Sequence, residues 1–465
     1  MPAEQIVVGA TMAALVAADA IASEGRPVRL LLPERGVGGG FAALRRDGRT
    51  LELGVRLLEL DFEDTTAAGP PLEGYVAGTT TARPWARVIG DWVRGVAGDR
   101  LREIGRPAMV LDGRLVDDVL FTVDLSALPA TLDGAEREQM LAEVGVALAT
   151  TGEDAGVLAP RHDGRFARLT LEAASLANHG PTFHERIIAP LCDKVIAGGA
   201  RAVSAPLRRK VWAPLFHPRT LAQALAGEPI GFRPSRPFHT IGPDGCGGLV
   251  DALLERLRAR PTATVETAGT LERVTAAGSD GTVLLTFSGR EPVSARRPIL
   301  ALSAEALFAA AGIPYAVRKV TTAIAWLEVD AAEAAGVPEL VHVLDPANPV
   351  LRVSRGGGGA APGRALLTVE LRHDSDPDAL DTAALGGLIA AGLVPEGTNA
   401  DAVMAARRPT FPVPDAGTLA AFRAARDRFD ALALDVELAG GGLDVTADTL
   451  NDQVLQGLRA SARTS

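Results

Sequence analysis

The sequence is poor in lysine, cysteine and aromatic residues, and each shortage excludes a class of protein. Lysine occurs only at Lys194, Lys210 and Lys319, and the net charge of −10 argues against a nucleic-acid partner. Two cysteines, Cys192 and Cys246, cannot build a disulfide framework and suit a reducing cytoplasm. Aromatic residues make up only 4% of the chain, and its two tyrosines leave little room for an aromatic cage around an amine.

Two further absences concern membranes and metals. No apolar run is long enough to span a bilayer, and the chain enters a strand within its first five residues, which leaves no room for a signal peptide. No CxxC, HExxH or similar spacing indicates a metal site. We therefore expect a cytoplasmic protein without a membrane span. Its 465 residues, 47% of them hydrophobic, are too many for one simple core and favour two domains.

The first 34 residues have the pattern of a βαβ unit. Apolar alternation and run length predict a strand at Gln5–Val8, a helix at Met12–Ser23 and a second strand at Val28–Leu32. Gly25 follows the helix as a stop signal. Both strands are mostly Val, Leu and Ile, as in a parallel sheet that is buried on both faces. The chain is therefore expected to be of the α/β class, with helices on both faces of a parallel sheet.

One glycine stands where the first strand meets the first helix. A dinucleotide-binding turn carries the motif G-x-G-x-x-G at this point, and its helix N-terminus offers N–H groups to a pyrophosphate. Here only Gly9 is kept, while Thr11 and Ala14 occupy the second and third glycine positions. Thr11 places a branched side chain where the phosphates would approach. The candidate phosphate-binding residues are Gly9, Ala10, Thr11, Met12 and Ala13.

The remaining elements are expected in mixed order along the chain. The pattern predicts further helices at Trp85–Val96, Ala135–Thr150, Phe183–Ala197 (kinked at Pro190), Leu249–Ala259 and Leu450–Ala462. It predicts further strands at Leu51–Leu60, Val265–Leu271, Val283–Phe287, Pro298–Ser303, Thr321–Val329, Ala365–Leu371 and Val436–Ala439. A glycine loop at 36–40 can approach a ligand closely.

Taken in order, these pieces resemble the FAD amine-oxidase superfamily, which includes amine oxidases, protoporphyrinogen oxidases, phytoene-type desaturases and UDP-galactopyranose mutases. Leu51–Gly54 resembles its apolar-acid-apolar-Gly strand, and Phe238–Leu257 resembles its Gly-Gly pair followed by a helix. Val265–Val274 is similar to the strand pair near the adenine. Leu438–Gly441 resembles the Ala-Gly-Asp turn, and the helix from Leu450 resembles the last helix, whose N-terminus faces the flavin.

The resemblance implies a Rossmann-like FAD-binding domain interleaved with an α+β substrate domain. The first would use residues 1–60, 231–305 and 410–465, and the second 61–230 and 306–409. FAD is the implied cofactor. The implied cofactor-binding residues are Gly9, Ala10, Thr11, Met12, Ala13, Glu34, Gly38, Gly39, Val274, Gly440 and Gly441, and the substrate candidates are Arg56, His217 and His239.

Two acids of the family pattern are missing from this chain. An acid that binds the adenosine ribose is expected at Leu32, and Glu34 lies two residues beyond it. Gly441 stands where the family has the acid that holds the ribityl–phosphate region. A charge-assisted hydrogen bond contributes about 1.5–3 kcal/mol, so the two losses predict FAD binding weakened by about two to four decades.

Three functions follow from these observations. The first is a flavin oxidoreductase that acts on a small molecule in an interdomain cleft. The second is a degenerate relative that has lost FAD and serves as a cofactor-free enzyme, or as a ligand-binding or partner protein. The third is non-redox FAD chemistry, as in the mutases. The fold alone does not choose among them. The expected partners are a small molecule and, as an open alternative, a second copy of the chain or another protein.

Overall fold

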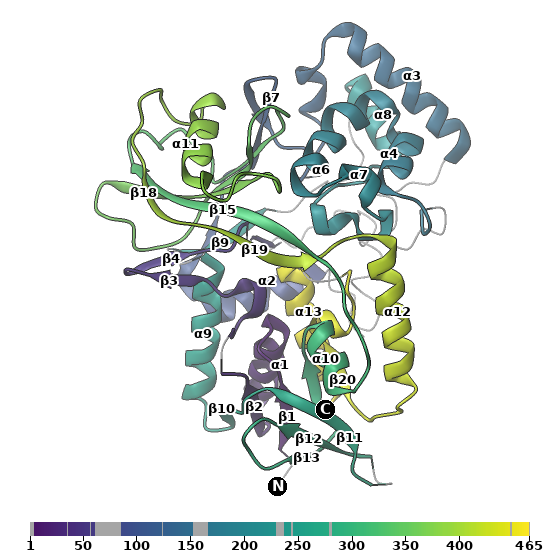
Figure 1. The fold of residues 1–465 in the computed structure, drawn as a ribbon, viewed down its shortest axis with the longest axis vertical. Helices are drawn as coiled ribbons and strands as arrows, with labels where there is room; N and C mark the ends of the chain where they lie inside the picture. The colour runs from purple at the N-terminus through teal and green to yellow at the C-terminus, as the bar shows by residue number, and fades with distance from the viewer. Residues whose placement is uncertain are drawn as a thin grey trace.

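The structure is a computed structural model, and it describes residues 4–34, 36–55, 57–60, 85–122, 124–151, 166–228, 237–242, 245–278, 281–446 and 449–464. The chain forms two halves, one above the other in Figure 1. The lower half holds a parallel sheet and both ends of the chain. The upper half holds a larger sheet beside a group of helices.

A five-stranded parallel sheet forms the centre of the lower half. Its strand order is β10–β2–β1–β14–β20, and every neighbouring pair runs parallel. The strands are β1 (Gln5–Val8), β2 (Val28–Leu32), β10 (Ala263–Thr267), β14 (Ile299–Ala301) and β20 (Glu437–Ala439). This order places β1 and β14 side by side at the centre, where a doubly wound sheet changes direction.

Both faces of this sheet are covered. One face packs against α1 (Met12–Ser23), α9 (Gly245–Ala259) and α13 (Leu450–Arg463), which share a core with Val7, Leu30 and Ile299. The opposite face, with Ile6, Val8 and Leu300, packs against an antiparallel sheet and two helices. These elements are β11 (Leu271–Ala276), β12 (Thr282–Phe287), β13 (Val293–Arg296), α10 (Ala304–Ala310) and α12 (Ala416–Asp430). The α/β fold with helices on both faces of a parallel sheet is confirmed.

The upper half contains a seven-stranded sheet. Its order is β19–β15–β18–β17–β16–β7–β8, and its pairs are antiparallel except β16 with β7. The strands are β7 (Ala108–Leu111), β8 (Arg114–Asp117), β15 (Lys319–Asp330), β16 (Leu340–Val343), β17 (Val350–Arg355), β18 (Arg364–Leu371) and β19 (Asp401–Pro412). The helix α11 (Leu380–Ala390) packs on one face of this sheet.

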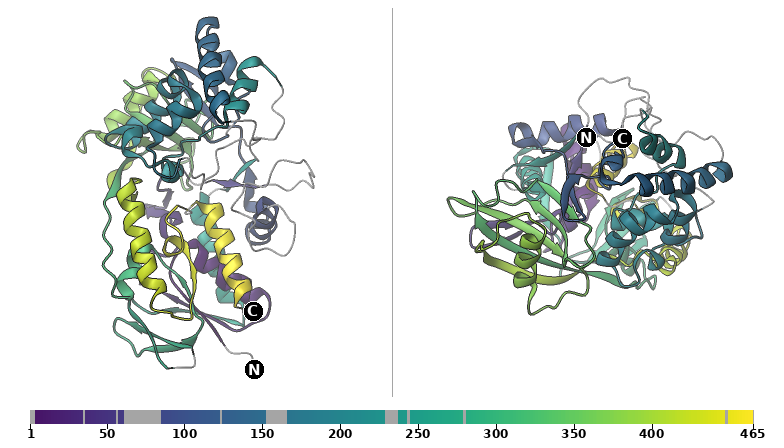
Figure 2. Two further views of the ribbon diagram at one scale, coloured as in Figure 1. Left: turned by 90° about the vertical axis from the view of Figure 1, so that its right-hand side faces the viewer. Right: turned by 90° about the horizontal axis from the view of Figure 1, so that it is seen from above.

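Helices pack around a separate apolar core beside this sheet (Figure 2). They are α3 (Gly134–Thr151), α4 (Leu171–His179), α5 (Pro181–Phe183), η4 (His184–Ile188), α6 (Ala189–Val195), α7 (Gly199–Ala202), η5 (Ala205–Val211) and α8 (Pro218–Ala226), with η3 (Leu128–Thr131) nearby. The remaining elements are η1 (Gly39–Phe41), β3 (Leu44–Arg46), β4 (Arg49–Leu51), β5 (Leu58–Glu59), α2 (Trp85–Ala97), η2 (Gly98–Arg100), β6 (Leu101–Glu103), β9 (Phe238–Ile241) and η6 (Gly440–Gly442).

The predicted strand at Leu51–Leu60 is wrong. The chain instead forms the end of β4 and the two-residue β5, because Gly54 has a positive φ of 89° that turns the backbone between them. A side chain at Gly54 would also come within 3.0 Å of the Glu370 carboxylate. The turn therefore brings this segment against the upper sheet instead of continuing a strand.

Two predicted helices differ from the observed ones. The predicted helix at Leu249–Ala259 begins earlier, at Gly245, because the buried Glu52 carboxylate accepts the Cys246 N–H at 2.7 Å and completes the helix N-terminus. Phe183–Ala197 is instead the run α5–η4–α6, which contains one π-helical turn before Pro190. A proline lacks the N–H of a regular helix, and the wider turn accommodates it.

Candidate functional site

The turn between β1 and α1 is packed directly against β14. A side chain at Gly9 would lie 2.1 Å from the Ala301 carbonyl oxygen, and Gly9 has a φ of +133°, so only glycine fits. Thr11 caps α1, because its hydroxyl oxygen accepts the Ala14 N–H at 3.3 Å. The same hydroxyl donates to the Ala301 carbonyl at 3.0 Å. Thr11 therefore takes the place of a phosphate-facing glycine and ties the helix to the sheet.

Three glycine positions predicted from the sequence gather around this turn. The Gly38 N–H donates to the Ala10 carbonyl at 2.6 Å. A Cβ placed on Gly39 would lie 3.7 Å from the Thr11 Cα, and one on Gly440 would lie 3.4 Å from the Thr11 hydroxyl. The structure thus brings these residues together at the end of β1. We call the set formed by Gly9–Ala13, Gly38–Gly39 and Gly440 the cradle.

Two glutamines of α13 bind backbone N–H groups of the cradle. The Gln453 side-chain oxygen accepts the Ala13 N–H at 3.3 Å, and the Gln456 side-chain oxygen accepts the Gly440 N–H at 2.7 Å. Both side chains are more than nine-tenths buried. They lie three positions apart and so point from the same face of the helix. Two N–H groups that the family resemblance assigns to a dinucleotide are therefore bonded within the chain.

Two contacts hold α13 in this position, and a capping box stabilises its first turn. A Cβ on Gly457 would lie only 2.6 Å from the Ala13 carbonyl oxygen, so α1 and α13 touch backbone to backbone. Thr449 and Asp452 form a capping box at the start of the helix. The Asn451 amide bridges both backbone groups of Glu59, at 3.1 Å to its N–H and 2.7 Å to its carbonyl. The glutamines are therefore presented by a rigid support.

The positions of the two missing acids hold no substitute carboxylate. Leu32 is buried at the end of β2, where its carbonyl accepts the Ala268 N–H at 2.7 Å. Glu34 is exposed two residues further on. Gly441 lies in η6, where an added Cβ would make only ordinary contacts, with its nearest neighbours at 3.6 Å. Val274 is a buried core residue of β11.

The substrate candidates have local partners or lie outside the described part of the chain. Arg56 is outside the described residues. His217 caps α8, since its Nδ1 accepts the Arg219 N–H at 3.3 Å. His239 lies in β9, where its Nδ1 is 3.2 Å from the Pro237 carbonyl, and burial lowers the pKa of its imidazole. A substrate role for these residues stays a prediction.

A polar row that sequence reasoning missed crosses the upper sheet. His342, Arg352 and Glu370 are direct cross-strand neighbours on β16, β17 and β18, so their side chains share one face. Arg352 binds both Glu370 carboxylate oxygens, at 3.1 and 2.5 Å. Glu370 also accepts the Val55 N–H at 3.2 Å. This face of the sheet is therefore joined to the segment that follows β4 in the lower half.

His342 forms a buried dyad with Asp118. Its Nδ1 lies 2.9 Å from the Asp118 carboxylate, and neither side chain is exposed. Phe121 stacks on the imidazole at a centroid distance of 4.6 Å. Burial lowers the pKa of His342, although Asp118 acts in the opposite direction. The two residues are 224 positions apart, and no local pattern in the sequence links them.

Two negative findings apply to the described residues. None of their helices combines the length and the apolar character needed to cross a bilayer. Within the same ranges, no group of three or more histidine, cysteine or acidic side chains is placed to hold a metal ion.

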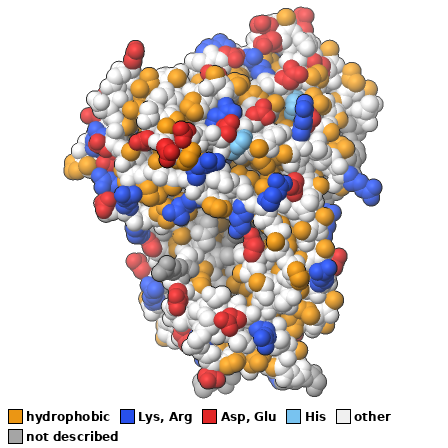
Figure 3. Space-filling model, viewed as in Figure 1, with side chains coloured by type: hydrophobic (Ala, Val, Ile, Leu, Met, Phe, Trp, Pro, Cys, Tyr) orange, Lys and Arg blue, Asp and Glu red, His pale blue; other side chains and the backbone are white. Residues whose placement is uncertain are grey.

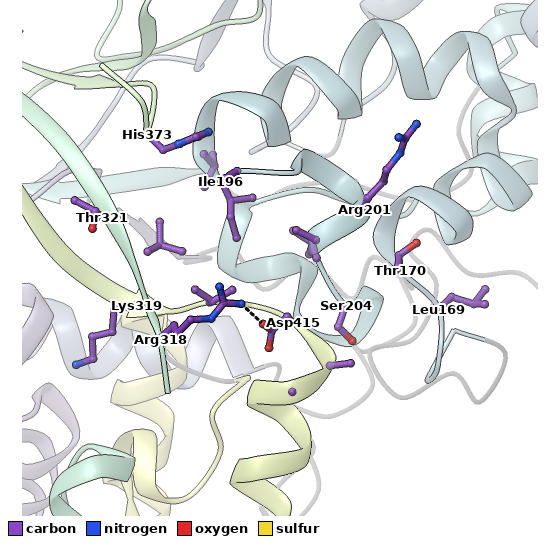
Figure 4. A pocket seen from close by; sticks show the side chains of 18 of the residues that line it. Leu169, Thr170, Ile196, Arg201, Ser204, Arg318, Lys319, Thr321, His373 and Asp415 are labelled. Carbon is purple, nitrogen blue, oxygen red and sulfur yellow. Dashed lines mark hydrogen bonds and ion pairs between the residues drawn. The ribbon is translucent and has the colours of Figure 1, made fainter. Parts of the chain in front are cut away.

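A hollow of about 650 Å³ lies where the two halves meet (Figure 4). Its walls come from the segment around α7, the beginning of β15, the end of β19 and the first residues of α12. Its volume is in the range of small-molecule sites. An interdomain cleft was expected, but no local sequence pattern identified these lining residues, because they are scattered between positions 168 and 417.

Comparison with known proteins identifies the fold. No protein-family model matches this chain, and no curated protein matches it in sequence. A reduced UDP-galactopyranose mutase has a TM-score of 0.70 at 15% identity, covering 100% of this chain and 94% of the other. Cyclohexylamine oxidase from Brevibacterium oxydans has a TM-score of 0.59 at 15% identity, covering 98% and 97%. A putrescine oxidase variant redesigned in cofactor binding has a TM-score of 0.56 at 12% identity, covering 99% and 98%.

At these identities the likeness shows the fold alone. The chain shares the fold of the mutase and the two oxidases over almost its whole length, including a Rossmann-like half. The resemblance inferred from the order of weak motifs is confirmed at this level.

Proposed function

We propose that this chain is a flavin-free relative of the FAD-dependent oxidoreductases that binds a small molecule in the cleft between two domains. The domains are those expected from the sequence, 1–60, 231–305 and 410–465 against 61–230 and 306–409. One observation carries the proposal: Gln453 and Gln456 occupy backbone donors that a dinucleotide would need. The cradle therefore does not fit FAD as it stands.

The energies support this view. FAD would have to displace two amide–backbone hydrogen bonds, each with a net worth of about 0.5–1.5 kcal/mol. It would also lack two charge-assisted hydrogen bonds of about 1.5–3 kcal/mol each, at the positions of Leu32 and Gly441. The sum of about 4–9 kcal/mol corresponds to about three to six decades of affinity.

A flavin oxidoreductase is the second candidate, and the fold favours it. The mutase and the two oxidases align with this chain over almost its whole length. If FAD were bound, the N-terminus of α1 and the Gly38–Gly39 loop would face its phosphates, and the flavin would supply hydride transfer. The two proposals differ in one property, which is the presence of FAD.

The test is a visible spectrum and an FAD titration of the purified full chain, followed by flavin fluorescence. We expect a colourless protein without saturable FAD binding. A yellow protein with about one FAD per chain would overturn the flavin-free proposal and leave the second candidate standing.

A gain-of-binding variant makes the test sharper. Gly441→Asp restores one missing carboxylate at a position with room for a side chain, and should tighten any residual FAD binding about ten- to a hundredfold. Gly336→Asp adds the same charge at another open position and serves as the matched control. Equal effects of the two substitutions would contradict the assignment of Gly441 to the position of the missing acid.

A further inference from the structure

Among the charged side chains that line the hollow between the two halves, basic ones outnumber acidic ones. Arg168, Arg201, Arg318, Lys319 and Arg407 line it together with His373, and Asp415 is its only acidic residue among those described. Arginine and lysine side chains also form a band across the middle of the face seen in Figure 3. A basic concave surface is unexpected on a chain with a net charge of −10. This contrast points to a negatively charged ligand.

Two of these cations are engaged elsewhere. Arg201 pairs with Glu172 at 2.8 Å, and Lys319 pairs with Glu305 at 3.1 Å. Figure 4 shows the charged ends of Arg201 and Lys319 pointing away from the hollow. They contribute to the field of the site but are not assigned as direct contacts.

Arg407 and Arg318 are the cations that we assign to direct contact with a ligand. Arg407 donates to the His373 backbone carbonyl at 2.7 Å, and no ion pair is observed for it among the described residues. Arg318 pairs with Asp415 at 3.0 Å along the edge of the hollow (Figure 4), and the Arg318 side chain is 81% exposed. An exposed ion pair contributes little stability, so an incoming anion can take over Arg318 at small cost.

The first turn of α12 adds positive electrostatic potential to that of the arginines. Ala416 and Gly417 line the hollow at the N-terminus of this 15-residue helix. Asp415 accepts the Thr418 N–H at 2.7 Å, and the two intervening N–H groups belong to the first turn, where a helix has no internal acceptors. Gly417 has no side chain to cover them. The helix dipole there favours negative charge.

We propose that this hollow binds a small organic anion through its phosphoryl or carboxylate oxygens. Arg318, Arg407 and the N–H groups of Ala416 and Gly417 hold the anionic group, and the rest of the molecule occupies the remaining volume. This inference deepens the proposed function by naming the class of ligand. It shares with that function only the assumption that a small molecule binds between the two halves. The hollow and the cradle have no residue in common, so anion binding and FAD binding can be measured independently.

The experiment is isothermal titration calorimetry of the full chain with pyrophosphate and, separately, with citrate. We expect saturable binding of at least one probe, weakening as sodium chloride is raised. Arg407→Gln and Arg318→Gln should each lower the affinity about three- to tenfold. Arg408→Gln is the matched control, because Arg408 is the next residue on β19, is also exposed and points to the other face.

A fourth variant separates binding from folding. Gly417→Glu puts an acid in the first helical turn, where it favours the helix, yet it should abolish binding of both anions. No saturable binding of either probe would overturn the proposal, and so would equal losses in Arg407→Gln and Arg408→Gln. If the chain holds FAD and also binds citrate through Arg407, only the flavin-free function is refuted. If the chain is colourless and binds neither probe, only the anion site is refuted.

Discussion

Replacing Gln456 by alanine tests whether the glutamines of α13 support the cradle. The side-chain oxygen of Gln456 accepts the Gly440 N–H at 2.7 Å, and both residues are buried. Removing the acceptor of a buried donor costs about 1–3 kcal/mol. We expect Gln456→Ala to lower the free energy of unfolding by this amount. Gln453→Ala should cost less, because its bond to Ala13 is longer, at 3.3 Å.

The assay is urea denaturation followed by circular dichroism, with the change read from the midpoint at constant slope. The matched control is Gln139→Ala on α3, because Gln139 is exposed and its one hydrogen bond among the described residues is to Glu143, one helical turn away. This control should change stability by no more than about 0.5 kcal/mol. If Gln456→Ala and Gln139→Ala behaved alike, the claim that the cradle is closed by its own chain would be refuted.

Three further predictions concern packing, pH and the buried dyad. Gly457→Ala should lower the free energy of unfolding by about 1–3 kcal/mol, because the added methyl group forces α1 and α13 apart. Gly386→Ala on α11 is the control, because this position has open space and the substitution should raise the free energy of unfolding by up to about 1 kcal/mol. Urea denaturation measures both values. Burial lowers the pKa of His179 from 6.5 to about 3, so the stability it contributes is complete above pH 6.5 and is lost as the pH falls toward 3, at up to about 1.4 kcal/mol per unit. His179→Gln should flatten that slope in a series of urea curves between pH 7 and 4, and an unchanged slope would contradict this. Asp118→Ala removes the acceptor of the Phe121 N–H and the partner of His342, and should lower stability by at least about 2 kcal/mol in the same assay; a loss below about 0.5 kcal/mol would show that the dyad is not structurally important.

Local signals predicted the parts of the fold that depend on local interactions. The strands at Gln5–Val8 and Val28–Leu32 and the helix at Met12–Ser23 agree with the structure at every boundary. Their apolar periodicity and the stop at Gly25 are contained in a few neighbouring residues. The start of α9 was missed because four residues of low helix propensity precede Leu249, and a distant carboxylate, Glu52, supports them.

The site was only partly predictable for a related reason. The glycines of the cradle could be located because a glycine between a strand and a helix is a local sign. The role of Gln453 could not, since a glutamine in an amphipathic helix ordinarily faces water. Long-range folding brings together His342 and Asp118, which form a hydrogen bond. It also places Arg318 and Arg407 in the lining of one hollow. Neither arrangement exists before the sheet has aligned the strands and loops that carry these residues. The sequence therefore indicated a dinucleotide-type turn that lacks two of its three glycines, but not the two glutamines that bind backbone N–H groups beside it.

The contact between α1 and α13 also constrains how the protein can be made. Ala13 and Gln453 are 440 positions apart, and the edge strand β20 is supplied by residues 437–439. A growing chain emerges from the ribosome N-terminus first, so α1 exists long before its partner helix does. The seven-stranded sheet and its helices are complete by residue 412, well before that. Assembly of the lower half must therefore wait until residues 437–463 have been synthesised, and until then its first βαβ unit lacks the helix that packs on α1.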